Sequence, residues 1–129
     1  MHIGHIAIWT NHLERMREFY EKYFQARAGS KYQNVAKQYE SYFLSFTSGA
    51  QLELMSLPGI TEITMGADKK FEGYAHVCIA CGSKECVDDL TERIRKDGYH
   101  VVDGPRLTGD GYYESVILDP DDNRVEITV

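Results

Sequence analysis

The chain consists of two halves that resemble each other, and this internal repeat is the strongest constraint on its fold. An apolar segment near the start, His5–Ile8, is matched by His76–Ile79 in the middle of the chain. Late in each half a glutamate precedes an aliphatic residue, first at Glu53 and then at Glu126. The separation between histidine and glutamate is nearly the same in both halves. Each half therefore offers one imidazole from an early strand and one carboxylate from a late strand.

The composition and the net charge limit the classes of protein to which the chain can belong. A chain of 129 residues of which 43% are hydrophobic can bury one core, which predicts a single domain over 1–129. The net charge of −6 argues against nucleic acid or an anionic membrane as a partner, because both attract basic surfaces. No apolar segment approaches the roughly 20 residues of a membrane span. The first residues show no export signal, so we expect a cytoplasmic protein.

Hydrophobic periodicity predicts an α+β protein with one module over about 1–58 and a second over about 71–129. Each module has a strand, a helix and then two or three strands. The helices are expected from Leu13 to Tyr23, after a Thr10 or Asn11 N-cap, and from a Ser83 N-cap to Gly98. The predicted strands cover 5–10, 40–47 and 51–57 in the first half and 73–80, 99–102, 112–118 and 124–129 in the second, with loops over 31–37 and 104–111 and a connector over 60–70.

Strand parity puts the histidines and glutamates on comparable faces, because side chains alternate sides along a strand. In the last predicted strand Val125 and Ile127 share one face, which leaves Glu126 on the other. The same alternation separates Glu53 from Leu52 and Leu54, His5 and Trp9 from Ile6 and Ile8, and His76 and Cys78 from Val77 and Ile79. All four polar residues therefore lie opposite the aliphatic positions that we expect to pack under the helices.

This pattern favours a metal site. A single histidine on a strand is usually structural, and a single carboxylate usually faces water. Two repeated pairs are different, since imidazole and carboxylate are standard ligands of divalent first-row metals. Carboxylates gathered on one face would also repel each other without a cation.

The three cysteines, in contrast, do not indicate a second metal site. Their number is odd, with cysteines at Cys78, Cys81 and Cys86. Cys78 and Cys81 have the spacing of half a zinc-finger site, but no second Cys/His pair follows at the required spacing. We expect small buried thiols rather than a disulfide framework or a structural zinc site.

Longer motifs carry a resemblance to a known family. The segments 73–77, Gly-Tyr-Ala-His-Val, and 119–127, Asp-Pro-Asp-x-Asn-Arg-Val-Glu-Ile, together with the paired halves, resemble the vicinal oxygen chelate superfamily. This superfamily includes glyoxalases, bleomycin-resistance proteins and extradiol dioxygenases, and the chain is most similar to glyoxalase I (lactoylglutathione lyase). The resemblance covers essentially the whole chain. It implies two tandem βαβββ modules that form a curled mixed sheet around a metal site, with His5, Glu53, His76 and Glu126 as ligands, and a homodimer.

The resemblance also implies a reaction. Two histidines with two glutamates are the glyoxalase I-like ligand set, whereas the dioxygenases use two histidines and one glutamate. The expected cofactor is a divalent metal (Ni, Co, Zn or Mn). The small-molecule substrate would be the hemithioacetal of methylglyoxal and a thiol such as glutathione, converted to the S-lactoyl thioester. Glu126 would be the catalytic base, and Glu53 mainly a ligand and a second catalytic carboxylate.

Several alternatives stay open at this point. The chain could be another metal-dependent member of the superfamily, such as an epimerase, a thiol transferase or a dioxygenase, or a non-catalytic drug-binding resistance-type protein. His2 is an alternative ligand, and the site could lie within one chain or be shared by two. The expected substrate-binding residues are Trp9 on the His5 face and Arg106, Tyr112 and Glu114 in the segment 104–115, which resembles a loop of glyoxalase-like proteins.

Overall fold

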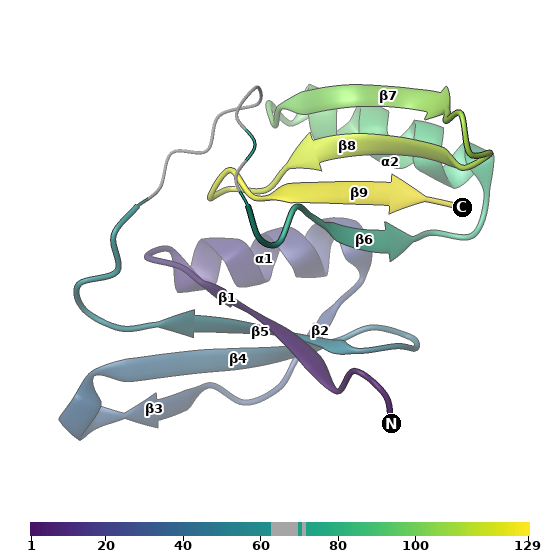
Figure 1. Ribbon diagram of the computed structural model, residues 1–129. Helices are drawn as coiled ribbons and strands as arrows, with labels where there is room; N and C mark the ends of the chain where they lie inside the picture. Colours follow the sequence, from purple (N-terminus) through teal and green to yellow (C-terminus); the bar gives the residue numbers. More distant parts are fainter. Residues whose placement is uncertain (63–69, 71) are drawn as a thin grey trace. The chain divides into compact units, whose positions relative to one another are not determined.

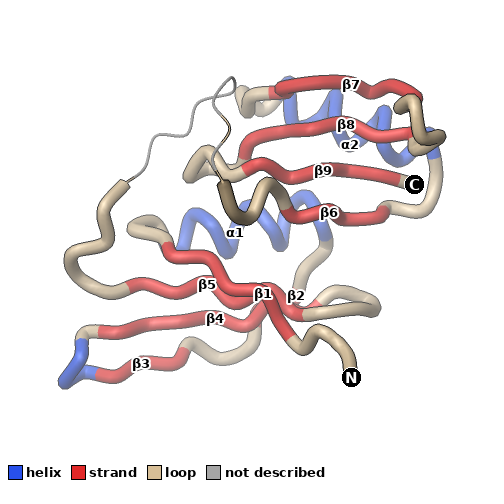
Figure 2. The backbone as a smooth tube through the Cα atoms, in the orientation of Figure 1, coloured by secondary structure: helices blue, strands red, loops and turns tan. Residues whose placement is uncertain are grey.

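The computed structural model describes residues 1–62, 70 and 72–129 (Figure 1). The chain divides into two compact units, Met1–Ile63 and Thr64–Val129. Each unit has its own sheet and its own helix, as the tube in Figure 2 makes plain. The predicted connector over 60–70 lies mostly outside the described residues.

The first unit contains a mixed sheet with α1 packed against it. The strands run in the order β1-β5-β4-β2, with β3 also paired to β4. β1 and β5 are parallel, whereas β4 pairs antiparallel with its neighbours. The elements are β1 (His5–Trp9), α1 (Leu13–Phe24), β2 (Arg27–Ala28), β3 (Tyr32–Asn34), the short 3₁₀ helix η1 (Val35–Lys37), β4 (Tyr39–Ser45) and β5 (Gln51–Ser56).

Helix α1 follows the predicted period, but its N-terminal cap differs. The apolar positions at three- and four-residue steps are buried: Leu13, Met16, Phe19, Tyr20 and Tyr23. The predicted Thr10 or Asn11 cap is wrong, because the N-cap residue is His12. Thr10 is buried and continues the ladder of β1, with its N–H donating to the Met55 carbonyl at 2.9 Å. The hydroxyl of Thr10 accepts from the His12 N–H at 2.8 Å, just before the helix begins.

The predicted loop over 31–37 is a second difference. It contains β3 and η1, and Asn34 caps η1 by accepting the Lys37 N–H at 3.1 Å. β3 pairs only with β4 and is largely exposed. A short edge strand of this kind buries little side-chain surface, so its sequence lacks the apolar alternation by which strands are recognised.

The second unit repeats the arrangement of the first. Its strands run in the order β6-β9-β8-β7, with β6 and β9 parallel and the other pairs antiparallel. Helix α2 packs against β7, β8 and β9 (Figure 1). The predicted Ser83 cap is confirmed, since its hydroxyl accepts the Cys86 N–H at 3.1 Å. The elements are β6 (Val77–Ala80), α2 (Lys84–Lys96), β7 (Val101–Leu107), β8 (Tyr113–Leu118) and β9 (Arg124–Thr128).

The predicted loop over 104–111 is wrong in its first part, because β7 continues to Leu107. The strand accommodates Gly104 through shifts of register against β8. Gly104 has φ +80°, and a Cβ there would lie 2.6 Å from the Glu114 carbonyl oxygen. Only glycine fits this irregularity, which is the usual meaning of an isolated glycine in a strand. As a result Arg106 is a strand residue paired with Glu114 rather than a loop residue.

The α+β fold of two βαβββ modules is thereby confirmed, with an open sheet in each unit. The core faces of the late strands are buried as predicted, with Leu52, Leu54, Val125 and Ile127 almost wholly inaccessible. The edge strand β1 is covered less than expected: Ile6 was predicted to pack under the helix but is 38% exposed. An edge strand has a neighbour on one side only, so its side chains are less enclosed.

Candidate metal centre

The first histidine–glutamate pair is assembled by the parallel strands β1 and β5. Glu53 is in register with Ala7, which places it diagonally from His5 on the same face of the sheet. The His5 Nε2 and Glu53 Oε2 atoms are 3.6 Å apart. The edge of the Phe43 ring, on β4 opposite Glu53, contacts the His5 ring, with centroids 5.3 Å apart.

The second pair repeats this geometry at β6 and β9. Glu126 is in register with Cys78, and His76 precedes β6 by one residue. The His76 Nε2 and Glu126 Oε2 atoms are 3.5 Å apart. In both units the carboxylate is recessed and the imidazole reaches outward: the side chains of Glu53 and Glu126 are 12% and 17% exposed, against 50% and 43% for His5 and His76.

The donor chemistry of each pair suits a divalent metal. Two neighbouring ligands bound at about 2.1 Å lie roughly 3 Å apart, so each nitrogen–oxygen separation needs only a small adjustment. Across the described residues no group of three or more metal-ligating side chains occurs. Each pair thus stands in the described structure as two candidate ligands within its own unit.

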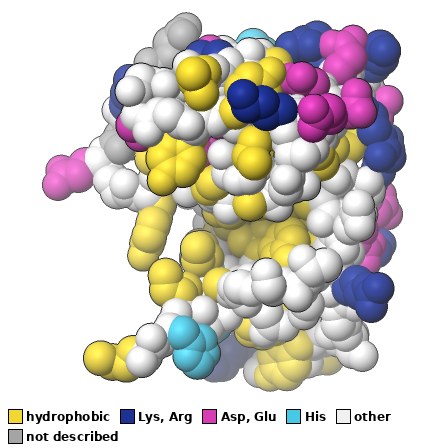
Figure 3. Space-filling model, turned by 90° about the vertical axis from the view of Figure 1, so that its right-hand side faces the viewer, with side chains coloured by type: hydrophobic (Ala, Val, Ile, Leu, Met, Phe, Trp, Pro, Cys, Tyr) yellow, Lys and Arg dark blue, Asp and Glu magenta, His cyan; other side chains and the backbone are white. Residues whose placement is uncertain are grey.

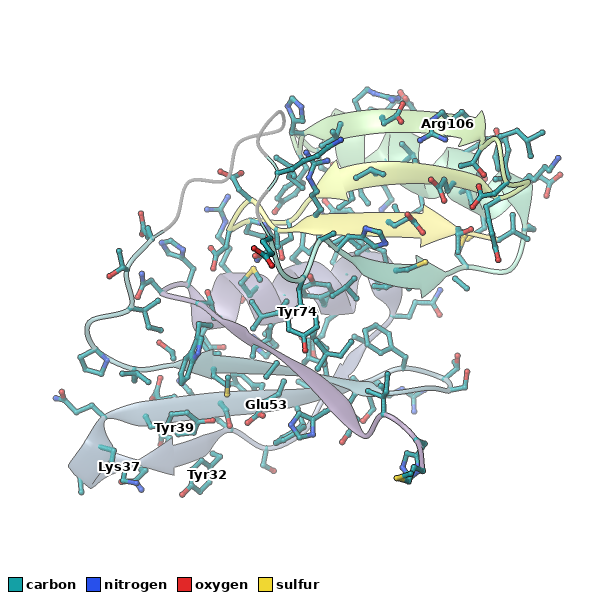
Figure 4. All side chains as sticks on the ribbon, viewed as in Figure 1. Tyr32, Lys37, Tyr39, Glu53, Tyr74 and Arg106 are labelled. Carbon is teal, nitrogen blue, oxygen red and sulfur yellow. The ribbon has the colours of Figure 1, made fainter. Side chains whose placement is uncertain are left out.

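Glu53 accepts a hydrogen bond from a tyrosine that the sequence patterns did not predict. The Tyr39 hydroxyl donates to Glu53 Oε1 at 3.1 Å, while the other carboxylate oxygen faces His5. The Tyr39 ring meets Trp9 and Tyr32 in edge contacts, with centroids 6.3 and 6.0 Å apart. Burial, followed by the Glu53 carboxylate, raises the pKa of Tyr39, so the phenol stays protonated and remains a donor. Tyr32, Tyr39 and Glu53 are labelled on the first sheet in Figure 4.

The surroundings of Glu126 are different. The Cys78 thiol lies in register with it on β6, and partial desolvation, followed by this carboxylate, raises the pKa of Cys78 to about 12. A thiol is a weak donor. Glu114 lies on the neighbouring strand β8, where burial first and the Glu126 charge second raise its pKa. Glu126 thus faces a weak donor and a second carboxyl group.

The residues predicted to bind the substrate lie in different parts of the structure. Arg106 and Glu114 come together, with Arg106 Nη2 and Glu114 Oε1 3.7 Å apart. The Arg106 Nε–H also donates to Asp103 at 2.6 Å, and this pairing raises the pKa of Arg106. Tyr112 precedes β8 and is 59% exposed. Trp9 is in the first unit, on the strand that carries His5.

There is a physical reason why the sequence did not indicate three residues around the site: Tyr39, Phe43 and Asp103. A sequence reveals which residues of one strand share a face, but the register between two strands decides which residues meet. The available signal was that Tyr39 and Phe43 share one parity in an aromatic-rich segment, so that both could lie on the Glu53 face.

Comparisons with known proteins agree with the fold and the motif. The chain matches the model of the Glyoxalase/Bleomycin resistance protein/Dioxygenase superfamily over residues 2–127. The protein therefore belongs to this superfamily. The comparison with curated proteins returns no match.

Solved structures of glyoxalase I share the fold. Glyoxalase I from Zea mays superposes with a TM-score of 0.80 at 22% identity, covering 98% of this chain and 44% of the maize chain. This chain thus spans less than half of the maize protein. The trypanothione-dependent glyoxalase I of Leishmania major gives a TM-score of 0.76 at 24% identity over 99% of this chain and 86% of its own. A lactoylglutathione lyase from Agrobacterium tumefaciens gives 0.68 at 21% identity over 98% and 91%.

On the face shown in Figure 3, basic and acidic side chains are interspersed rather than gathered into a basic patch. None of the helices in the described ranges is long and apolar enough to cross a membrane.

Proposed function

We propose that this protein is a divalent-metal-dependent isomerase of the glyoxalase I type. Its substrate would be the hemithioacetal of methylglyoxal and a thiol such as glutathione, and its product the S-lactoyl thioester. The observation that carries the proposal is the pair of matching His–Glu arrangements, each with a recessed carboxylate, an outward imidazole and a nitrogen–oxygen separation of 3.6 or 3.5 Å.

His5, Glu53, His76 and Glu126 would hold the metal together, as the repeat and the family membership support. When bound, a cation such as Ni²⁺, Co²⁺, Zn²⁺ or Mn²⁺ would act as a Lewis acid that makes the hydrogen next to a carbonyl more acidic. Whether the two pairs come from one chain or from two chains of a homodimer leaves this ligand set unchanged.

Glu126 would move the proton. The reaction takes one proton from the carbon that bears sulfur and returns a proton to the neighbouring carbon, so atoms and electrons balance without an oxidant or a reductant. To act as the base, a glutamate needs a carboxylate oxygen that is available to accept the proton. Glu126 is better suited to this than Glu53, since it lies beside the Cys78 thiol, a weak donor, and near the Glu114 carboxyl group.

Arg106 and Glu114 would border the substrate on the Glu126 side, and Trp9 and Tyr112 would contribute apolar surface. The Arg106 guanidinium is already shared by Asp103 and Glu114. Its role would therefore be to keep Glu114 in place, in addition to any contact with the substrate.

The test is formation of the thioester from methylglyoxal and glutathione by metal-stripped protein reloaded with Ni²⁺, Co²⁺, Zn²⁺ or Mn²⁺. Turnover that depends on the metal is the expected result. Tight metal binding without turnover would point to a different reaction of the superfamily. A protein that shows no metal binding and no turnover would contradict the proposal and would favour a drug-binding protein.

A further inference from the structure

The two glutamates are equivalent in the repeat but not in their hydrogen bonding. Each is paired with a histidine at nearly the same distance. Only Glu53, however, accepts a hydrogen bond from a phenol, through its second oxygen. A group that binds the outer oxygen of a metal-ligating carboxylate fixes the orientation of that ligand and strengthens it.

Tyr39 is itself held in place. Trp9 from β1 and Tyr32 from β3 contact its ring edge-on, and the hydroxyl points to Glu53 Oε1. Aromatic edge contacts of this kind orient a ring as well as burying it. Three strands of the first unit therefore converge to aim one hydroxyl at one carboxylate oxygen.

The corresponding position of the second unit lacks this arrangement. Phe43 and Val116 both face the glutamate of their unit across the sheet. Tyr39 lies four residues before Phe43, and Tyr112 lies four residues before Val116. Tyr112 precedes β8 and is largely exposed; its N–H donates to the Thr108 hydroxyl and its carbonyl accepts from the Thr108 N–H. The sequence thus preserves a tyrosine in both halves, while the structure directs only the first one to a glutamate.

We propose that Tyr39 is a positioning residue that fixes Glu53 as a constant metal ligand and thereby makes the two glutamates unequal. This inference rests on the proposed metal centre, although not on the identity of the substrate. Glu53 keeps one oxygen on the phenol and offers the other, beside His5, to the cation. Glu126, without such a partner, is the carboxylate that can change its contacts during a reaction.

The experiment measures metal affinity by chelator competition, with Co²⁺ as the probe, in wild-type protein and in Tyr39→Phe. Phenylalanine keeps the ring contacts and removes only the hydroxyl. The expected result is a loss of Co²⁺ affinity of about tenfold, the lower end for groups that orient a ligand. Tyr42→Phe is the matched control and should leave the affinity unchanged, because the Tyr42 hydroxyl donates to the Glu14 carboxylate rather than to either His–Glu pair. Thermal unfolding of both variants checks that each is folded.

A double-mutant cycle shows whether Tyr39 acts through Glu53. In a Glu53→Gln background, Tyr39→Phe should have little further effect on Co²⁺ affinity. Equal affinity of wild type and Tyr39→Phe would overturn the inference, as would an undiminished effect in the Glu53→Gln background.

Failure of the proposed function is a separate result. Wild-type protein that binds Co²⁺ but forms no thioester would reject the glyoxalase reaction, while a Tyr39 effect on affinity would still support the inference. Wild-type protein that binds no Co²⁺ would reject the metal centre and the inference with it.

Discussion

The two units place a glutamate beside a histidine in the same way but surround it differently. In the first unit the Tyr39 phenol donates to Glu53, and the Tyr39 ring is itself in contact with two other aromatic rings. In the second, Glu126 lies beside the Cys78 thiol and has the Glu114 carboxyl group nearby. The difference indicates how a symmetric fold can give two equivalent glutamates unequal surroundings: the register within each sheet places the His–Glu pairs alike, and residues on the adjacent strands differ.

The largest expected effect separates the two glutamates by turnover. At saturating metal, Glu126→Gln should lower kcat by roughly 10²–10⁴-fold, the usual contribution of a general base, while keeping part of the metal affinity. Glu53→Gln should lose more metal affinity, and added metal should restore part of its turnover. Steady-state thioester formation over a metal titration measures both. Equal behaviour of the two variants would show that the carboxylates are interchangeable.

The buried faces of β5 and β9 should contribute alike to stability. Leu54 and Ile127 follow the two glutamates and are both fully buried. Substitution of either by alanine leaves a cavity and should lower the free energy of unfolding by about 2–5 kcal/mol. Denaturant unfolding of metal-free protein measures the change. Gln51→Ala, on the exposed side of β5, is the control and should change the free energy by no more than about 0.5 kcal/mol. A similarly small change for Leu54→Ala or Ile127→Ala would contradict the assignment of these faces to the core.

Cys78 should report on the charge of Glu126. Because burial and the Glu126 carboxylate raise the pKa of Cys78 to about 12, little thiolate exists at pH 8, and alkylation by iodoacetamide should be slow and should accelerate as the pH rises toward that pKa. Glu126→Gln removes the charge and should speed alkylation about tenfold, which corresponds to one unit of pKa. Mass spectrometry of the Cys78 peptide gives the rate. Glu53→Gln, in the other unit, serves as the control, and an identical rate in Glu126→Gln and wild type would refute the contact.

The smallest expected effect concerns the helix starts. Ser83 caps α2 through its hydroxyl, whereas the His12 side chain makes no capping hydrogen bond at the start of α1. Ser83→Ala should therefore cost about 1 kcal/mol of stability, and His12→Ala should cost less. Thermal unfolding of the two variants compares them directly. A larger loss for His12→Ala would reverse the ranking.

The sequence predicted the parts of this molecule that depend on a single strand or helix. Alternation within 51–57 and 124–129 separated Glu53 and Glu126 from their buried neighbours, and the 3.6-residue period located the buried face of α1. Both follow from local geometry, which a sequence records directly.

Features that depend on two strands were not predictable in this way. The strand over 104–107 was obscured by Gly104 and Pro105, which read as a loop although the register shifts accommodate them. The hydrogen bond from Tyr39 to Glu53 requires the register of β4 against β5, and no pattern within either strand specifies it. The asymmetry between the two glutamates is therefore a property of the folded structure.

The central claim is that the two His–Glu pairs form one metal centre. The most direct test is the stoichiometry of tightly bound Co²⁺ or Ni²⁺ per chain in wild type, His5→Ala and His76→Ala, by equilibrium dialysis and elemental analysis. The account predicts one metal per wild-type chain and loss of tight binding in both variants. Two metals per chain, or a variant that keeps the tightly bound metal, would show that each pair acts alone and would contradict the claim.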